Sequence, residues 1–196
     1  MPPLAPKKQL TVQNIGVVLP LEATLEQHAT KPFAPFDLDS IFQSYSGYVA
    51  SIVLRLLGRE SDVEDVVHDV FLAAMRGLKE LRDPQAAKWW LKTVAVRTAR
   101  RRLRQRRFLT FLSFEHEDDY QGLIASGPSP EDGVLLARVY QVLDGVRANE
   151  RIAWTLHVVE GERLEDVAQL CGCSITTAKR RIAATRGQIR QALGDE

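Results

Sequence analysis

The chain has 196 residues, of which 45% are hydrophobic and 26% charged, and its formal net charge is +1 at pH 7. This is enough apolar material for one core or two small ones, and no apolar run approaches the roughly 20 residues that span a bilayer, so we expect no membrane insertion. The near-neutral total conceals segregated charge, because acidic blocks at 60–69 and 115–119 flank an arginine run at 97–107. The local sign of the charge therefore indicates the partners better than the total does.

Residues 1–36 carry six prolines and no sustained hydrophobic period. This composition predicts an extended or partly disordered leader, in which residues 15–19 are compatible with a strand. The two cysteines, Cys171 and Cys173, stand too close together for a disulfide framework and favour a reducing, cytoplasmic location. We interpret them as small core residues, because no further metal ligands accompany them.

The first two helices are predicted from apolar residues that recur at spacings of three and four. Residues 38–57 form the first helix, which Gly58 ends. Ser61 and Glu64 have the spacing of a capping box for the second helix, whose buried stripe runs over 63–78.

The outward face of the second helix is acidic at its start and contains one leucine. Glu64 and His68 are spaced as a ligand pair, but no second cluster completes a metal or catalytic site, so we predict none. Leu72 on a polar face is typical of a protein contact, although single exposed leucines are common. The acidic block and this face contain Asp62, Asp65, His68, Asp69 and Leu72.

The third predicted helix carries the strongest functional pattern in the chain. Asp83 and Pro84 supply its N-cap and first turn, and WWLKTVAVRTARRRLRQRR follows at 89–107. That segment spans about 28 Å as a helix. At 100° per residue, its apolar face consists of Leu91, Val94, Ala95 and Thr98.

The opposite face is basic and begins at a tryptophan pair. Seven arginines between 97 and 107 have no acid among them, so their repulsion destabilises the helix unless a polyanion or an acidic neighbour offsets it. Arginines pair with phosphates and indoles stack on unstacked bases, so we predict a nucleic-acid-binding face. The alternatives are a solvated basic face and core tryptophans. The face and its bracketing indoles comprise Trp89, Trp90, Thr93, Arg97, Arg100, Arg104 and Arg107.

The remaining chain predicts a linker and a second group of helices. Residues 109–129 mix aromatic, acidic and Gly/Pro stretches, which is typical of a linker with little regular structure. Ser129 and Pro130 begin the next helix, and Asn149 is placed to cap the one after it.

Residues 164–182 have the pattern of a helix-turn-helix. Ala168 lies four residues before Gly172, which supplies the positive φ of the turn, and Ser174 caps the second helix. A plain helical hairpin is the alternative. The predicted inward residues are Ile175, Ala178, Ile182, Ile189 and Leu193.

The outward residues of that second helix are suited to DNA. Its N-terminal residues reach base edges in such a motif, and its arginines reach phosphates. They are Thr176, Thr177 and Arg180, flanked by Lys179, Arg181 and Arg186. We therefore predict an all-α protein with two small helical domains, at 37–108 and 130–196, joined by a flexible acidic linker at 109–129.

With these motifs in this order, the chain resembles the extracytoplasmic-function (ECF) sigma factors of bacterial RNA polymerase. DVEDVVHDVF at 62–71 is similar to the family's polymerase-binding helix, and WLKTVAVRTARRRLRQRR at 90–107 to its promoter-melting helix. ERLEDVAQLCGCSITTAKRRIAATRGQIRQAL at 162–193 is similar to its C-terminal DNA-binding domain. The resemblance covers about 37–193 and leaves the leader outside.

The resemblance implies a role for each set of residues. Asp62, Asp65, His68, Asp69 and Leu72 would bind the polymerase. Trp89, Trp90, Thr93, Arg97, Arg100, Arg101 and Arg104 would open the minus-ten element, although Arg97 and Arg101 stand where the family commonly has Asn and Asp. Thr176, Thr177, Lys179, Arg180, Arg181 and Arg186 would read the minus-thirty-five element.

The resemblance also implies the partners, which are core polymerase, promoter DNA and an anti-sigma factor. The expected protein is cytoplasmic, is not an enzyme and has no cofactor, because polymerase performs the chemistry. Two rival functions are a stand-alone helix-turn-helix regulator, which would bind duplex DNA without polymerase, and an adaptor whose basic face docks on an acidic protein.

Overall fold

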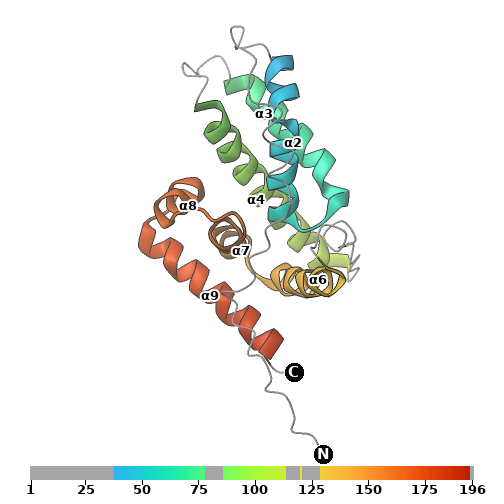
Figure 1. Cartoon of the computed structure of the whole chain (residues 1–196), viewed down its shortest axis with the longest axis vertical. Helices are drawn as coiled ribbons and strands as arrows, with labels where there is room; N and C mark the ends of the chain where they lie inside the picture. Colours follow the sequence, from blue (N-terminus) through green and yellow to red (C-terminus); the bar gives the residue numbers. More distant parts are fainter. Residues whose placement is uncertain (1–37, 78–85, 114–119, 121–128, 195–196) are drawn as a thin grey trace, which may run out of the picture.

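The computed structural model describes residues 38–77, 86–113, 120 and 129–194 (Figure 1). Every regular element in these ranges is helical, so the predicted all-α class is confirmed. The leader, with the strand considered at 15–19, lies outside the described residues, as does the predicted Asp83–Pro84 start of the third helix. None of the helices in the described ranges combines the length and apolar character that a membrane crossing needs.

The N-terminal bundle consists of three helices and a short turn. They are α2 (Leu38–Leu57), the 3-10 turn η3 (Glu60–Asp62), α3 (Val63–Gly77) and α4 (Ala87–Ser113). Gly58 ends α2 with a φ of 70°, as predicted. The apolar stripes face one another, and the completely buried side chains include Ile52, Leu56, Val70, Leu91 and Ala95.

Two predicted boundaries in this bundle differ from the structure. Ser61 lies inside the η3 turn, whose N-cap is Arg59 without a side-chain cap, so the predicted capping box is wrong. The tight turn places Asp62 inward toward α4 instead. Helix α4 continues through Ser113, so the first residues of the predicted linker are helical.

The C-terminal domain contains α6 (Pro130–Gly145), α7 (Ala148–Trp154), the π-helical turn η6 (Thr155–Val159), α8 (Leu164–Cys171) and α9 (Ile175–Gly194). Ser129 caps α6 as predicted, because its Oγ accepts a hydrogen bond from the Asp132 N–H at 3.1 Å. The predicted Asn149 cap is wrong, because α7 already begins at Ala148 after an extended Arg147.

The helix-turn-helix forms as predicted. Gly172 adopts a left-handed conformation with φ 61°, and the Cys173 N–H bonds to the Ala168 carbonyl at 2.9 Å. Ser174 caps α9 by accepting a hydrogen bond from the Thr177 N–H at 3.2 Å. These contacts fix the angle at which α9 leaves the turn.

The inward face of α9 is slightly rotated from the prediction. Ala178, Ile182 and Ile189 are buried, but Ile175 is 40% exposed. Thr185 is fully buried instead, and its hydroxyl donates to the Arg181 carbonyl within the helix, which satisfies the polar group.

The two domains pack directly against each other. Helix α4 contacts both α7 and α8, and α2 contacts η6 (Figure 1). The buried apolar residues of both domains join in one continuous cluster. Composition and periodicity predicted two domains but contained no signal of this interface.

Candidate nucleic-acid interface

Helix α4 is held by a stripe of small and apolar residues, which determines where its basic side chains point. Leu91, Ala95, Ala99 and Leu103 recur at every fourth position and are buried against α2 and α3. Small alanines let the helices approach closely, and the basic residues occupy the remaining faces. The arginines therefore divide into three groups.

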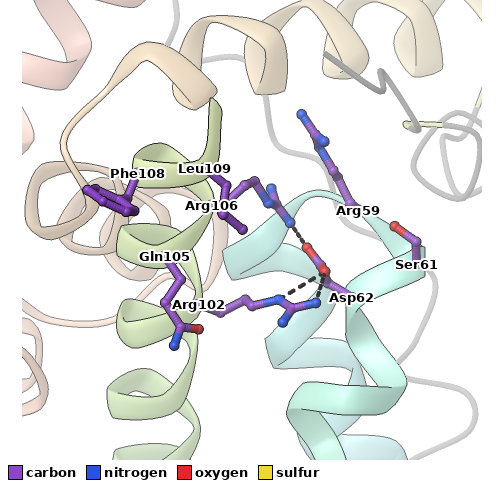
Figure 2. A pocket seen from close by; sticks show the side chains of 8 residues that line it. All are labelled: Arg59, Ser61, Asp62, Arg102, Gln105, Arg106, Phe108 and Leu109. Atoms are coloured by element: carbon purple, nitrogen blue, oxygen red, sulfur yellow. Dashed lines mark hydrogen bonds and ion pairs between the residues drawn. The ribbon is translucent and has the colours of Figure 1, made fainter. Parts of the chain in front are cut away.

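The first group turns toward the start of α3 (Figure 2). Arg102 donates to Asp62 Oδ1 at 2.7 Å from Nη2 and 3.0 Å from Nε, and Arg106 pairs with the other oxygen of the same carboxylate. Arg101 pairs with Asp69 at 2.7 Å on the surface. Burial lowers the pKa of Arg106 to about 10, assisted by repulsion from the nearby Arg59 guanidinium.

The second group faces the C-terminal domain. Arg100 donates to the carbonyls of Leu170 and Cys171, at 3.5 and 3.2 Å, where the dipole at the end of α8 favours a cation. Arg104 reaches the Asn149 amide oxygen at 3.3 Å. Lys92, about two helical turns before Arg100 on the same helix, pairs with Glu162. The predicted basic face is thus partly covered by protein.

The third group remains exposed. Arg97 and Arg107 are exposed and have no hydrogen bond or ion pair with the residues that the structure describes. Thr93 is half-buried and donates its hydroxyl to the Trp89 carbonyl at 3.0 Å. Of the predicted basic face, Arg97 and Arg107 are the positions most open to an external phosphate.

The tryptophan pair begins this face but also belongs to the core. Trp89 and Trp90 are half-buried and pack against the apolar cluster. The Trp90 ring lies against Gly77 at the end of α3, where an added Cβ would come within 2.6 Å of its Cζ2. The two tryptophans therefore contribute to the hydrophobic core, which was the alternative prediction for them.

The outward face of α3 contains the residues predicted to bind a protein. Asp65 and His68 are exposed and Leu72 is 44% exposed. Asp62 and Asp69 are paired with arginines of α4, and Asp65 also lies 3.6 Å from the Arg102 guanidinium. A cavity of about 870 Å³ lies between α2 and α3. Its lining combines apolar and acidic groups and includes Phe42, Ala50, Val63, Val67, Glu64, Asp65, His68 and Asp69.

Two exposed apolar side chains extend this surface beyond the prediction. Phe42 is 47% exposed and makes an edge-on contact with the Phe71 ring at 4.8 Å between centroids, and Met75 is 49% exposed near the end of α3. The sequence does not distinguish Phe42 from the other apolar residues of 38–57, because its spacing fits the period of that helix. The apolar surface formed by Phe42, Leu72 and Met75 is typical of a protein-binding site.

The predicted recognition helix presents its polar side chains to solvent. Thr176, Lys179 and Arg180 are exposed, and Thr177 is partly covered by its contact with the Ser174 cap. Arg181 and Arg186 are half-buried at the flanks. The N-terminal half of α9 therefore has the shape and charge to enter a major groove.

The most buried polar cluster was not predicted. Arg151 is only 1% exposed and donates to the carbonyls of Leu56 and Leu57, at 3.1 and 2.6 Å, while pairing with Asp144. Asp144 also accepts from Arg59 at 2.7 Å and from the Tyr120 hydroxyl at 2.6 Å. No periodicity signals it, because its members come from four segments.

Charge pairing keeps Asp144 ionised in this cluster. Burial opposes its charged form, but Arg151, Tyr120 and Arg59 outweigh burial and lower the pKa of Asp144. In the described ranges, no group of three or more His, Cys, Asp or Glu side chains is arranged to hold a metal ion. The arrangement supports binding through charge and shape.

Known proteins that resemble this chain are sigma factors of bacterial RNA polymerase. Residues 41–108 match the sigma-70 region 2 family, which coincides with the N-terminal bundle. The chain is 28% identical over 164 residues to the RNA polymerase sigma-H factor of Pseudomonas aeruginosa, covering 79% of this chain and 85% of that one. It is 29% identical over 154 residues to the ECF RNA polymerase sigma-E factor of Escherichia coli K12, covering 74% and 80%.

Solved structures share the fold. The sigma factor RpoE in complex with the anti-sigma factor NepR, from Bartonella quintana, aligns with a TM-score of 0.59 at 22% identity, over 81% of this chain and 97% of that one. CnrH in complex with the cytosolic domain of CnrY aligns with a TM-score of 0.53 at 22% identity, over 89% and 97%. Residues 41–108 therefore match sigma-70 region 2, and across both domains this chain is similar to ECF RNA polymerase sigma factors.

Proposed function

We propose that this chain is the promoter-specificity subunit of an RNA polymerase, binding the core enzyme and directing it to start sites. The observation that carries the proposal is the order of parts in one chain: a sigma-70 region 2 on 41–108 precedes a helix-turn-helix on α8 and α9. A stand-alone regulator has no need of the first part. Polymerase performs the chemistry, so this chain contributes binding and strand opening and is not itself an enzyme.

The polymerase contact is proposed on the outward face of α3. Leu72 with Phe42 and Met75 supplies apolar area, and Asp65 and His68 supply a polar rim, a composition typical of protein interfaces. Asp62 and Asp69 contribute by holding the arginines of α4 against α3. The acidic start of α3 and its apolar end would then contact the same partner.

Strand opening is proposed along α4. Arg97 and Arg107 are exposed for phosphates, and the Trp89–Trp90 pair lies at the N-terminal end where a separated base is able to stack. Arg100, Arg101 and Arg104 belong to the same surface but are engaged in protein contacts in this structure. The minus-thirty-five element is assigned to Thr176, Thr177, Lys179, Arg180, Arg181 and Arg186 on α9.

A regulatory partner and a location follow from this function. The structural relative RpoE was solved with the anti-sigma factor NepR bound, and the relative CnrH with the cytosolic domain of CnrY bound. We extend an anti-sigma partner to this chain. A subunit that works with polymerase on chromosomal DNA acts in the cytoplasm.

The function is tested by reconstitution. Core polymerase free of any sigma factor is mixed with this protein and fragmented genomic DNA, and transcript 5′ ends are mapped. We expect discrete start sites that share two upstream elements. Duplex binding without polymerase and without any start sites would identify the stand-alone regulator, and absence of both DNA binding and polymerase binding would favour the adaptor.

A further inference from the structure

The cavity between α2 and α3 is floored by small and apolar side chains. On α2, Ser46, Gly47 and Ala50 share one face and leave little side-chain volume there. An added Cβ at Gly47 would meet nothing within 4 Å, so the space above it is open. The apolar lining of this cavity, which we call the α2–α3 groove, consists of Phe42, Ala50, Val63 and Val67.

The rim of the groove is acidic. Glu60 and Glu64 are exposed and form no ion pair with any residue that the structure describes. Asp65 and Asp69 add two more carboxylates, which are partly neutralised by arginines of α4. An apolar floor with an unneutralised acidic rim favours an occupant that is both apolar and basic.

The N-terminal leader contains a segment with this composition. Residues 4–21 carry Lys7 and Lys8 and no acid, because the first acid of the chain is Glu22. The two lysines precede a mostly apolar stretch, so basic and apolar groups follow one another along the segment. Its apolar side chains are Leu4, Leu10, Val12, Ile15, Val17, Val18, Leu19 and Leu21.

The leader is also attached at the right place. It joins the first residue of α2, the helix that forms one wall of the groove. The chain between Leu19 and Leu38 spans at most about 60 Å when extended, twice the roughly 30 Å length of α2. The segment therefore reaches every part of the groove, and the covalent tether makes docking an intramolecular step that needs little affinity.

We propose that residues 4–21 dock in the α2–α3 groove of the same chain, with Lys7 and Lys8 on the acidic rim and the apolar side chains on the floor. Docking would cover Asp65 and His68, which belong to the surface proposed to bind polymerase. This consequence rests on the proposed function, whereas the docking itself does not. Polymerase then has to displace the segment, so its apparent affinity falls by the undocked fraction.

The first test maps the contact in the full-length protein. A photo-crosslinking benzoylphenylalanine replaces Ile15, and mass spectrometry locates the crosslinks. We expect them in the groove of the same molecule. Lys7→Glu with Lys8→Glu should reduce their yield severalfold by setting like charges on the rim, and adding Glu60→Lys with Glu64→Lys should restore it.

A matched control and two outcomes decide this test. Lys179→Glu with Arg190→Glu, both exposed on α9, makes the same change in net charge away from the groove and should leave the crosslinks unchanged. Crosslinks to other surfaces, or an undiminished yield in the Lys7→Glu, Lys8→Glu protein, would overturn the docking. Crosslinks between two molecules would identify a second copy as the occupant and would also overturn it.

The second test fills the groove from its floor with Gly47→Leu. Leucine is a better helix former than glycine, and the open space above Gly47 accepts the side chain, so α2 should remain intact. The control is Gly187→Leu on α9, where an added Cβ also meets nothing within 4 Å. Crosslinking from residue 15 should fall severalfold in Gly47→Leu and stay unchanged in Gly187→Leu, with circular dichroism confirming the helices. Equal crosslinking in the two variants would contradict the proposal.

Measurements with core polymerase separate the docking from the proposed function. The Lys7→Glu, Lys8→Glu protein should bind core roughly threefold more tightly than wild type, and excess core should abolish the groove crosslinks. Equal affinities would overturn the shielding of the polymerase surface. Wild-type protein that directs initiation but gives no groove crosslinks removes the docking and leaves the function intact. Groove crosslinks in a protein that binds no polymerase in any form preserve the docking and remove the function.

Discussion

Five arginines of this protein illustrate two environments that the sequence does not distinguish. Arg102, Arg106 and Arg151 are drawn inward and paired with Asp62 or Asp144, whereas Arg97 and Arg107 remain at the surface. Residue type is the same in both sets, and so is the helix for four of the five. What differs is whether a carboxylate or a helix end lies within reach, and this decides whether an arginine holds the protein together or is available to a partner.

The comparison also explains how the arginine run of α4 folds without DNA. Its repulsion is offset within the chain by acids of η3, α3 and α6, and by carbonyls at the ends of α2 and α8. Of the two remedies that the sequence suggested, a polyanion or an acidic neighbour, the structure contains the second. The exposed Arg97 and Arg107 remain available to a polyanion.

The largest effect is expected from Arg151→Met. This change leaves Asp144 short of its buried partner and two carbonyls of α2 without their donor, so the free energy of unfolding should fall by about 3 to 5 kcal/mol. Urea denaturation followed by circular dichroism measures it. Arg190→Ala, at an exposed arginine of α9, should leave the midpoint unchanged. An equal response of the two variants would show that the buried set has no special role.

A smaller effect, dependent on pH, is expected from Asp144→Asn. Because the pKa of Asp144 is lowered in the folded protein, its contribution is present above the ordinary carboxyl pKa of about 3.9 and is lost as the pH falls through the lower folded value. The variant should be less stable than wild type by roughly 1 to 3 kcal/mol at pH 7, and the difference should shrink in acid. A difference that stays constant from pH 7 to pH 3 would contradict the assignment.

The smallest effect on stability, and a clear one on binding, is expected from Arg97→Ala. Losing one phosphate contact should weaken promoter binding by the holoenzyme and reduce the slope of log affinity against log salt by about 0.9, with an unchanged urea midpoint. Arg102→Ala is the counterpart from the paired set and should lower the urea midpoint instead. A reversal of these two results would remove the distinction between the sets.

Local patterns predicted the elements well where short-range chemistry decides them. The helix stop at Gly58, the Ser129 cap and the turn from Ala168 to Ser174 all depend on residues within one or two helical turns. Predictions failed where a neighbour in space changed the balance. Ser61 lost its capping role to a 3-10 turn that delivers Asp62 to two arginines. On α9, Ile175 at the first position is 40% exposed, whereas Thr185 lies on the buried face.

The predicted site residues also divide into those that periodicity could predict and those that depend on the tertiary structure. The polar face of α9 and the exposed positions on α3 could be read from periodicity, because a helix presents its faces independently of what packs behind it. The engagement of Arg100, Arg104 and Lys92 by the C-terminal domain could not, because their partners lie 45 to 71 residues away in sequence.

By itself, the amino-acid sequence determined the all-α class, the two helical domains, the helix-turn-helix and the concentration of arginine on α4, because each follows from spacing along a single helix or turn. Only the tertiary structure decided which arginines are occupied, that Asp144 and Arg151 join the domains, and that one stripe of α4 faces protein. Such choices depend on which oxygen atoms the folded chain brings within about 3 Å of a guanidinium, a distance that spacing along the sequence does not encode.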